Sequence, residues 1–318
     1  MATKQVVLGK TGLAITPLVF GTLPLGPLQA GLSPGEGGRL IRHALELGVN
    51  MLDTAALYDT YPHVRSGLQG FRGDVRIVTK THAADGVTAR GHVEKALREL
   101  GRERLDIVHI HGARIADPFT ERREVLDVLL EMKAEGKISH VGLSSHYISA
   151  IRTAADHPEI EVIHPLINST GMGILDGTAA EMAGAIAACA EAGKGVYAMK
   201  ALAGGNLISS ARQSIRYVLG LPGVHALAVG MLSMPEIVAN LALVTGGIED
   251  DEAWQALEKG RRRLRVMEAF CKGCGDCVPA CTAEALALQD GKARVDEEKC
   301  ILCGYCAAAC PDFIIRVV

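Results

Sequence analysis

Aromatic side chains are scarce in this sequence of 318 residues, because Phe, Trp and Tyr together make up 4% of it. An excess of charge of either sign is also missing: 33 Lys and Arg stand against 36 Asp and Glu, for a net charge of −3. Proteins that bind nucleic acid usually present a basic face, or aromatic platforms that stack on single-stranded bases. We therefore expect no nucleic-acid partner.

Long apolar segments are absent as well. A transmembrane helix needs about 20 predominantly apolar residues, and the best candidate, residues 224–244, contains His225, Pro235 and Glu236. The first ten residues lack the apolar segment of a secretory signal. We expect a cytoplasmic protein without a membrane partner. Its hydrophobic content of 48% is enough for a large core and excludes extensive disorder.

Cysteine is present but concentrated in one part of the chain. Eight of the nine Cys residues lie between Cys271 and Cys310. Cys189 stands apart in an Ala-rich helical pattern, and we expect it in the core. Without a secretory signal, a disulfide framework is a poor explanation for the other eight. Another chemistry has to hold their sulfur atoms.

The first 245 residues alternate short apolar runs with segments of helical period. Eight such runs occur, at residues 18–21, 50–53, 76–80, 105–111, 140–144, 161–168, 195–200 and 225–230. Repeated strand and helix indicate parallel pairing, and near-continuous apolar strands fit a sheet covered on both faces. Eight units in this length predict an α/β fold, a (β/α)8 TIM barrel over residues 1–260. The alternative, an open doubly wound sheet, lacks its glycine-rich fingerprint after the first run.

Polar residues collect where six of these runs end. They are Asp53, Lys80, His111, Ser144, Asn168 and Lys200. In a barrel, the C-terminal strand ends form the rim that carries the active site. Charged residues inside strands are costly unless they are paired, so we expect a functional rim rather than simple loop entrances. The basic run at residues 261–265, by contrast, is typical of a solvated helix face.

Residues 261–318 contain one cysteine spacing twice. The first copy is Cys271, Cys274, Cys277 and Cys281, and the second is Cys300, Cys303, Cys306 and Cys310. Between them, residues 285–295 predict two short strands around an Asp290-Gly291 turn. Three thiolates at this spacing can bind three irons of one cubane, while the fourth reaches the other cluster. Two structural zinc ions are the alternative, although zinc motifs usually pair two cysteines with a distant second pair.

This repeat resembles the bacterial ferredoxins that carry two [4Fe–4S] clusters, with Thr282 in place of the usual Pro as one departure. The resemblance implies a small ferredoxin-like α+β iron–sulfur domain over residues 261–318. It also implies the cluster ligands, which are Cys271, Cys274, Cys277 and Cys310 for one cluster and Cys300, Cys303, Cys306 and Cys281 for the other. Because so small a module has little core of its own, the clusters would supply much of its folding energy.

Four residues of the predicted barrel rim form a set that can deliver a proton. Tyr58 follows Asp53 by five residues, and Lys80 and His111 end the next two apolar runs. A tyrosine titrates at about 10 unless a neighbouring cation lowers its pKa. Lys80 would supply that cation, and Asp53 would hold it in place. His109 competes with His111, since both face the same way along a strand, but His111 lies nearer the rim.

The set resembles the catalytic tetrad of the aldo-keto reductases, and the resemblance covers most of the first 245 residues. It rests on GKTGL at residues 9–13, NMLDTA at 50–55, VTK at 78–80, LDIVHIH at 105–111, VGLSSH at 141–146 and VG at 229–230. The family implies a (β/α)8 barrel that reduces a carbonyl, or oxidises an alcohol, with NADP(H) or NAD(H). Carried over, Tyr58 is the general acid–base, Lys80 and Asp53 tune it, and His111 orients the substrate carbonyl.

The expected cofactor contacts follow from the same resemblance. Those around the nicotinamide are Ser144, Ser145, His164, Asn168 and Met199, the last at the stacking position. Those that would cradle phosphates are Lys200, Gly204, Gly205, Gly230 and Ser233, where a capped helix begins. No basic residue follows the eighth run directly, so the sequence does not choose between NADP and NAD.

A hydride carries two electrons and a [4Fe–4S] cluster passes one, which leaves three hypotheses. The first is an aldo-keto reductase whose clusters relay electrons or only shape the site. The second is a flavin-containing reductase coupled to a redox partner protein, and the third is a non-enzymatic redox sensor or electron carrier. The complete tetrad favours the first. We expect the iron–sulfur module to pack near the barrel mouth, and Arg114 to be a surface charge rather than an anion-binding group.

Overall fold

The computed structural model of the protein describes residues 4–312 and 314–317. Eight parallel strands close a barrel, in which β3 lies between β4 and β10. The strands are β3 (Leu18–Gly21), β4 (Met51–Asp53), β5 (Arg76–Thr81), β6 (Leu105–Gly112), β7 (Ile138–Ser145), β8 (Val162–Pro165), β9 (Gly195–Ala198) and β10 (Ala226–Gly230). They coincide with the eight apolar runs, so the predicted TIM barrel is confirmed. Every residue of β3, β4, β8 and β9 is buried, as a strand covered on both faces requires.

Helices surround the barrel between successive strands. They are α1 (Pro34–Glu46), α2 (Tyr61–Leu68), α3 (Gly86–Leu100), α4 (Pro118–Glu121), α5 (Arg123–Ala134), α6 (Ile148–Asp156), α7 (Ala179–Glu191), α8 (Ala211–Leu219), α9 (Met234–Thr245) and α10 (Asp251–Leu257). Ser33 and Thr178 begin α1 and α7 with capping boxes, which satisfy backbone N–H groups that would otherwise lack partners. Within the described residues, no helix has the length and apolar character that crossing a membrane requires.

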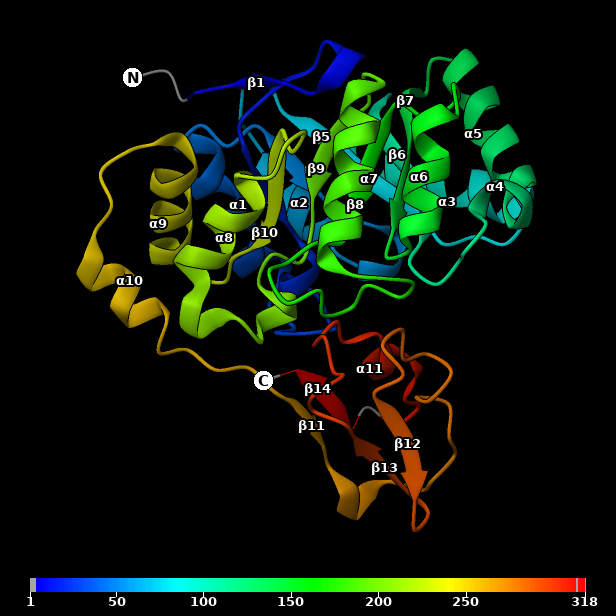
Figure 1. Ribbon diagram of the computed structural model, residues 1–318, viewed down its shortest axis with the longest axis vertical. Helices are drawn as coiled ribbons and strands as arrows, with labels where there is room; N and C mark the ends of the chain where they lie inside the picture. The colour runs from blue at the N-terminus through cyan, green and yellow to red at the C-terminus, as the bar shows by residue number, and fades with distance from the viewer. Residues whose placement is uncertain (1–3, 313, 318) are drawn as a thin grey trace.

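The two ends of the barrel are covered by different parts of the chain. A hairpin of β1 (Val6–Val7) and β2 (Ala14–Ile15) lies at the N-terminal strand ends, where Lys10 N donates to Gly193 O just before β9. The C-terminal module lies at the opposite end of the barrel, as Figure 1 shows. The module therefore faces the rim where TIM barrels place their active sites.

The module is built from two short sheets and one helical turn. β11 (Leu264–Val266) pairs with β14 (Ile315–Val317), and β12 (Leu286–Gln289) pairs with β13 (Lys292–Val295) around the expected Asp290-Gly291 turn. The helix α11 (Tyr305–Ala309) lies between the second and fourth cysteines of the second motif. Cysteines make up much of the small core, which holds Cys277, Cys281, Cys300, Cys306 and Cys310. A core of thiols has little apolar surface to stabilise it without bound metal.

Two glycines allow the backbones of barrel and module to meet. Gly204, in the loop after β9, has a φ of 73°, and any side chain there would collide with the carbonyl oxygen of Ile301. Gly304 of the module has a φ of 79° and lies in the same way against the carbonyl oxygen of Leu28. Both positions combine left-handed backbone with close approach, which only glycine tolerates without strain. The expectation that the module packs at the barrel mouth is confirmed.

Amide side chains of the barrel bind the backbone of the second cysteine motif. Asn206 Nδ2 donates to Cys300 O at 2.7 Å, and Gln29 Nε2 donates to Leu302 O at 3.2 Å. These bonds fix the loop that carries Cys300 and Cys303 against the barrel. Cys274 of the first motif, in contrast, is exposed. The second motif is thus the inner one and the first motif faces outward.

Arg114 is exposed, as expected of a surface charge, but it also contacts the iron–sulfur module. Its Nη1 donates to Cys281 O at 2.8 Å, and its Nη2 pairs with Glu284 at 2.7 Å. The sequence placed Arg114 in a short loop after β6, but it gave no sign that a module 167 residues further along would meet that loop. Arg114 therefore holds the two parts of the chain together.

The basic run at residues 261–265 is not part of a helix, contrary to the prediction. α10 ends at Leu257, and the chain then runs without helical structure to β11, which begins at Leu264. Arg262 turns toward the barrel, where its Nη1 lies 3.4 Å from Gln29 Oε1. The predicted domain boundary between residues 260 and 261 falls in this connector.

Candidate active site

A buried ion pair lies at the barrel mouth. Lys80 Nζ on β5 donates to Asp53 Oδ1 on β4 at 2.6 Å and to Thr54 O at 2.9 Å. The Lys80 side chain is 0% exposed and that of Asp53 is 5% exposed. Removing one partner would leave an uncompensated buried charge, so the position of each side chain depends on the other.

Tyr58 ends a 3-10 turn (Ala56–Tyr58) after β4 and places its ring beside this pair. Lys80 Nζ lies 5.1 Å from the centroid of that ring. The ring of His111 meets it edge-on, at a centroid distance of 5.9 Å. The structure thus brings together the four residues that the sequence singled out, although they come from three strands and one loop.

The pKa of Tyr58 lies well above its ordinary value, contrary to the expectation that Lys80 lowers it. Burial is the largest cause, followed by the nearby Tyr305 and Asp53. Lys80 offers little net charge to the phenol, because Asp53 compensates it and burial lowers the pKa of Lys80 itself. Tyr58 is therefore protonated at neutral pH, which suits a residue that gives a proton.

His109 and His111 have different surroundings. His109 is 0% exposed inside the barrel, and its Nε2 lies 2.7 Å from the Tyr197 hydroxyl. His111 lies at the rim beside Tyr58. Burial, and then the charge of Lys80, hold the pKa of His111 well below its ordinary value, so it is a neutral imidazole. The geometry favours His111 over His109 as the partner of Tyr58.

Sequence reasoning missed Tyr197, which lies at the centre of the barrel network. Its hydroxyl donates to Asp53 Oδ2 at 2.8 Å, and its carbonyl oxygen lies 2.7 Å from His164 Nδ1. The rings of Tyr197 and His164 stack with centroids 4.1 Å apart. One signal was present, because Tyr197 is the only polar side chain within β9. Its partners could not be inferred, since they lie on other strands.

A second missed residue comes from the iron–sulfur module. Tyr305 is the first residue of α11, and its hydroxyl lies 3.2 Å from His111 Nε2. Tyr305 also packs against the small cluster that contains Tyr58, and its proximity is one cause of the raised pKa of Tyr58. The sequence offered one signal, a large aromatic residue between the cluster cysteines Cys303 and Cys306. Tyr305 therefore belongs to the barrel site, although 194 residues separate it from His111.

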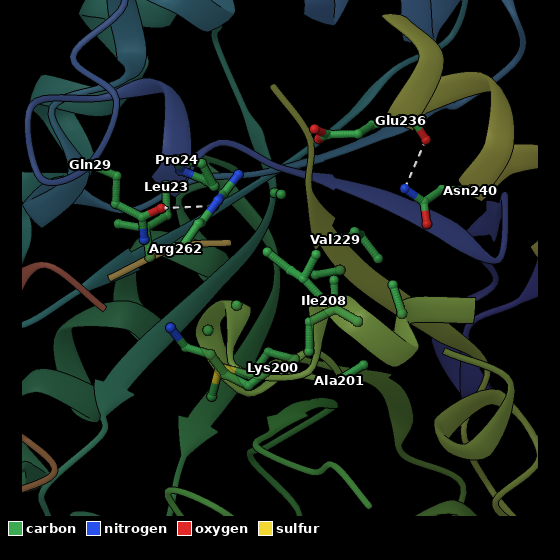
Figure 2. Close-up of a pocket in the computed structure, with 18 of the residues that line it drawn as sticks. Leu23, Pro24, Gln29, Lys200, Ala201, Ile208, Val229, Glu236, Asn240 and Arg262 are labelled. Carbon is green, nitrogen blue, oxygen red and sulfur yellow. Dashed lines mark hydrogen bonds between the residues drawn. The ribbon is translucent and has the colours of Figure 1, made fainter. Parts of the chain in front are cut away.

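A cavity connects this site to the outer helices. Its lining includes Asp53 and Tyr58, and extends to Trp254 of α10 and Arg262 of the connector. Figure 2 shows Arg262 beside Gln29 on one wall, with Glu236 and its hydrogen-bonded neighbour Asn240 on another. The cavity therefore offers an elongated ligand both the proton-bearing residues and a basic group.

The predicted cofactor contacts divide into two groups. Those that line the cavity are His164, Met199, Lys200, Gly204, Gly205 and Gly230. Those that do not line it are Ser144, Ser145, Asn168 and Ser233. Gly204 has a further constraint, because it also meets Ile301 of the module.

Three of the four residues that do not line the cavity already form local hydrogen bonds. Asn168 Oδ1 accepts from Thr170 Oγ1 at 2.8 Å, Ser145 Oγ accepts from Tyr147 N at 3.0 Å, and Ser233 caps α9. Ser144 is different, because its Oγ is buried and has no hydrogen-bond partner among the described residues. Its backbone lies in register between His111 and His164 at the mouth. A buried hydroxyl in this state fits a ligand amide, which the nicotinamide carboxamide would supply.

Two basic residues of the cavity lining come from the connector, which we expected to form a solvated helix face. Arg261 and Arg262 line the cavity. Burial lowers the pKa of Arg262, and the nearby Glu236 opposes this effect. A largely buried guanidinium in a cavity is suited to bind phosphate, because it presents several fixed N–H donors.

The cysteines of the module form two neighbourhoods. Burial, and then the nearby Cys274, Cys310 and Cys271, raise the pKa of Cys277. Burial, with Cys303 and Cys281 nearby, raises the pKa of Cys300 to about 11. Because burial and crowding oppose the negative thiolate form, these cysteines need a nearby positive charge to become thiolates. Bound iron would supply that charge. The neighbours correspond to the two ligand sets that the ferredoxin resemblance implies.

Backbone groups also point at these sulfur atoms. Ala285 N donates to Cys281 Sγ at 3.2 Å, and Ala293 N donates to Cys271 Sγ at 3.4 Å. Such N–H···S bonds are one means by which proteins tune iron–sulfur clusters. In the part of the chain that is described, no three His, Cys, Asp or Glu side chains converge closely enough for a single metal ion. Two sets of four cysteines are the ligand number that two [4Fe–4S] clusters require.

The barrel with a buried Asp–Lys pair, a tyrosine and a histidine at its mouth defines an oxidoreductase of the TIM-barrel class. The model of the Aldo/keto reductase family matches residues 17–218, and that of the 4Fe-4S dicluster domain matches residues 270–314. The chain belongs to the aldo/keto reductase family and is an oxidoreductase with a C-terminal iron–sulfur domain.

Curated relatives are similar over different lengths. L-galactose dehydrogenase of Arabidopsis thaliana is 22% identical over 282 residues, which cover 75% of this chain and 87% of the relative. Pyridoxine 4-dehydrogenase of Escherichia coli is 36% identical over 129 residues, or 33% of this chain and 43% of the relative. The oxidoreductase YqkF of Bacillus subtilis is 29% identical over 43% of this chain, and the match spans 48% of that relative.

Solved structures agree with the barrel. PA4992 from Pseudomonas aeruginosa, solved as an aldo-keto reductase, has a TM-score of 0.65 and 26% identity over 76% of this chain and 94% of its own. AKR11C1 from Bacillus halodurans has a TM-score of 0.64 and 23% identity over 81% of this chain and 95% of its own. The latter supports the fold alone.

Proposed function

We propose that the protein reduces a carbonyl compound to an alcohol with NADPH or NADH, using Tyr58 as the proton donor. The observation that carries this proposal is the arrangement at the barrel mouth. Tyr58 lies beside His111 and the buried Lys80–Asp53 pair, and it lines a cavity that Arg261 and Arg262 also line. General acid catalysis needs a protonated group held against the reacting oxygen.

The proton steps follow from the surroundings of Tyr58 and His111. Tyr58 keeps its proton at neutral pH because burial raises its pKa, and it would give that proton to the carbonyl oxygen as negative charge develops there. His111 is neutral, so its imidazole can hydrogen-bond the oxygen without competing as an acid. Lys80 lies near the Tyr58 ring, and its pairing with Asp53 would reduce the repulsion between that carboxylate and the phenolate that remains. These states favour reduction over alcohol oxidation.

The cavity residues fit a nicotinamide cofactor, which when bound supplies the hydride for this chemistry. Met199 and His164 line the same cavity as Tyr58, while the buried Ser144 Oγ, which does not line it, lacks a hydrogen-bond partner that the carboxamide would supply. Arg261 and Arg262 would bind phosphate groups, with Lys200 on the same cavity. Two guanidinium groups on the wall favour NADP over NAD, because the 2′-phosphate adds charge that they can pair.

The eight module cysteines would hold two [4Fe–4S] clusters with the ligand sets that the sequence implies. The inner set, Cys300, Cys303, Cys306 and Cys281, lies on the loops bound to the barrel, and the outer set contains the exposed Cys274. With these ligand sets, one cluster would lie beside the barrel site and the other would lie where a redox partner protein could reach it. The clusters would pass electrons or shape the site without supplying the hydride.

The proposal is tested by anaerobic assay of the full chain with its clusters intact, with benzaldehyde as the carbonyl probe and NADPH consumption as the readout. Tyr58→Phe removes the proton donor and should lower kcat about 100-fold or more. Tyr217→Phe on the outer helix α8 is the matched control and should leave kcat unchanged, since Tyr217 is exposed and is not among the residues that line the cavity. Equal kcat values for wild type and Tyr58→Phe would show that Tyr58 is not the acid.

A further inference from the structure

The Tyr305 hydroxyl occupies the position that the proposed reaction requires for the substrate oxygen. If Tyr58 protonates an oxygen that His111 orients, that oxygen has to lie within hydrogen-bonding distance of both residues. The Tyr305 hydroxyl lies in this region, because it is 3.2 Å from His111 Nε2 and Tyr305 packs against the cluster that contains Tyr58. The substrate oxygen and this hydroxyl exclude each other from the same position.

Tyr305 is tied to the inner cysteine motif. It is separated from Cys303 by Gly304 and is followed directly by Cys306. Gly304 lies against the Leu28 carbonyl oxygen, and Leu302 O accepts from Gln29. Because the residues just before Tyr305 are held against the barrel, its hydroxyl can leave His111 only if its ring rotates or the loop shifts. Either change alters the surroundings of the inner cysteines.

Resting on the proposed function, we propose that Tyr305 is an active-site residue contributed by the iron–sulfur module. The substrate oxygen displaces its hydroxyl from Tyr58 and His111, and this displacement links occupancy of the barrel site to the inner cluster. Tyr305 thereby sets how readily a carbonyl compound binds. Nothing in the barrel sequence alone specifies this residue.

Two consequences follow from the displacement. A substrate has to replace the hydrogen bond between Tyr305 and His111, so removing the hydroxyl should tighten substrate binding rather than slow the proton transfer. Hydrogen bonding and solvent exposure around a cluster set its electronic properties. Ligand binding in the barrel should therefore change the electron paramagnetic resonance spectrum of the inner cluster. If ligand binding also changes the reduction equilibrium of that cluster by some factor, then by linkage reduction of the cluster changes the affinity for the ligand by the same factor.

Tyr305→Phe tests the proposal, because it removes the hydroxyl and keeps the ring, while Tyr217→Phe is the matched control. In the full chain with its clusters, Tyr305→Phe should lower the KM for benzaldehyde about fivefold, the effect of one hydrogen bond, and leave kcat close to that of the wild type. Iron content is measured for each variant, so that a loss of clusters is recognised.

The second readout does not depend on turnover. Benzyl alcohol, an oxygen ligand that does not react with NADPH, is added to dithionite-reduced protein in the presence of NADPH, and the electron paramagnetic resonance spectrum is recorded. We expect a change in the wild type and in Tyr217→Phe that is lost in Tyr305→Phe. An unchanged wild-type spectrum, or the same change in Tyr305→Phe, overturns the proposal even if the wild type reduces benzaldehyde. If no carbonyl is reduced, the proposed function fails, while the spectra still decide the role of Tyr305.

Discussion

At the scale of single residues, the barrel mouth depends on compensated charge. Lys80 and Asp53 are both buried, and Asp53 also accepts from Tyr197. Each carboxylate oxygen thus has a separate donor. Such a pair contributes little net stability relative to apolar residues, but breaking it leaves a charge without a partner.

Asp53→Asn should therefore destabilise the barrel more than its small change in volume suggests. The ammonium of Lys80 would remain buried without a counter-charge, and we expect the free energy of unfolding to fall by about 3–5 kcal/mol. Denaturant unfolding followed by the fluorescence of Trp254, the single tryptophan, which is 2% exposed, measures this change. Adding Lys80→Met to the variant should restore part of the loss. A loss below about 1 kcal/mol for Asp53→Asn would mean that the pair is not compensated as the geometry indicates.

At the scale of elements, the C-terminal ends of the strands carry buried neutral histidines. His109 on β6 and His164 on β8 have pKa values well below the ordinary value, mainly because of burial. Burial, and then Lys200, lower the pKa of His146 to about 3. Below their ordinary pKa of about 6.5, the unfolded chain binds protons that the folded chain does not. The resulting stability is fully present above pH 6.5 or so and is lost progressively as the pH falls.

His146→Gln provides the matched test of this pH dependence. Each such histidine should contribute a slope of up to about 1.4 kcal/mol per pH unit to the free energy of unfolding below pH 6. Unfolding curves of Trp254 fluorescence between about pH 5 and 7 should show a smaller slope for His146→Gln, by the equivalent of one proton. Identical slopes would show that His146 is protonated in the folded barrel.

The elements themselves were largely predictable from the sequence, because each barrel strand is an apolar run and each motif of the module is local. The proximity of Asp53, Lys80 and His111 was predictable for a related reason: they lie at the ends of successive strands, and a closed barrel brings such ends together. Tyr58 follows in the turn after β4. Tyr305 and Arg114 could not be placed, since their partners lie 194 and 167 residues away across an interface that no local pattern encodes. The pKa of Tyr58 was predicted in the wrong direction, because burial outweighs a lysine already paired with Asp53.

At the scale of the whole molecule, one chain combines a barrel and a small module whose cores differ in composition. The barrel has a continuous apolar core, whereas much of the module's core is cysteine. The module covers the barrel mouth through glycine contacts and a few hydrogen bonds. The state of the clusters should therefore control both the module's fold and the position of Tyr305.

Removal of iron should unfold the module and leave the barrel folded. After anaerobic treatment with a strong iron chelator, amide hydrogen exchange should lose protection across β11 to β14, while barrel strands keep theirs. Trp254 fluorescence should stay that of the folded barrel, which serves as the internal control. Retained protection in β12 and β13 without iron would mean that the module's own side chains stabilise it.

The central claim is that a hydride, and not electrons from the clusters, reaches the carbonyl carbon in the barrel. The most direct measurement uses NADPH carrying deuterium at both C4 positions of the nicotinamide, with benzaldehyde and the full chain in ordinary water. Mass spectrometry of the benzyl alcohol should show one deuterium on the carbinol carbon in each product molecule, since the hydride moves directly while Tyr58 supplies only the hydroxyl proton. Unlabelled alcohol would contradict the account, because the carbon would then have taken its hydrogen from solvent after electron transfer.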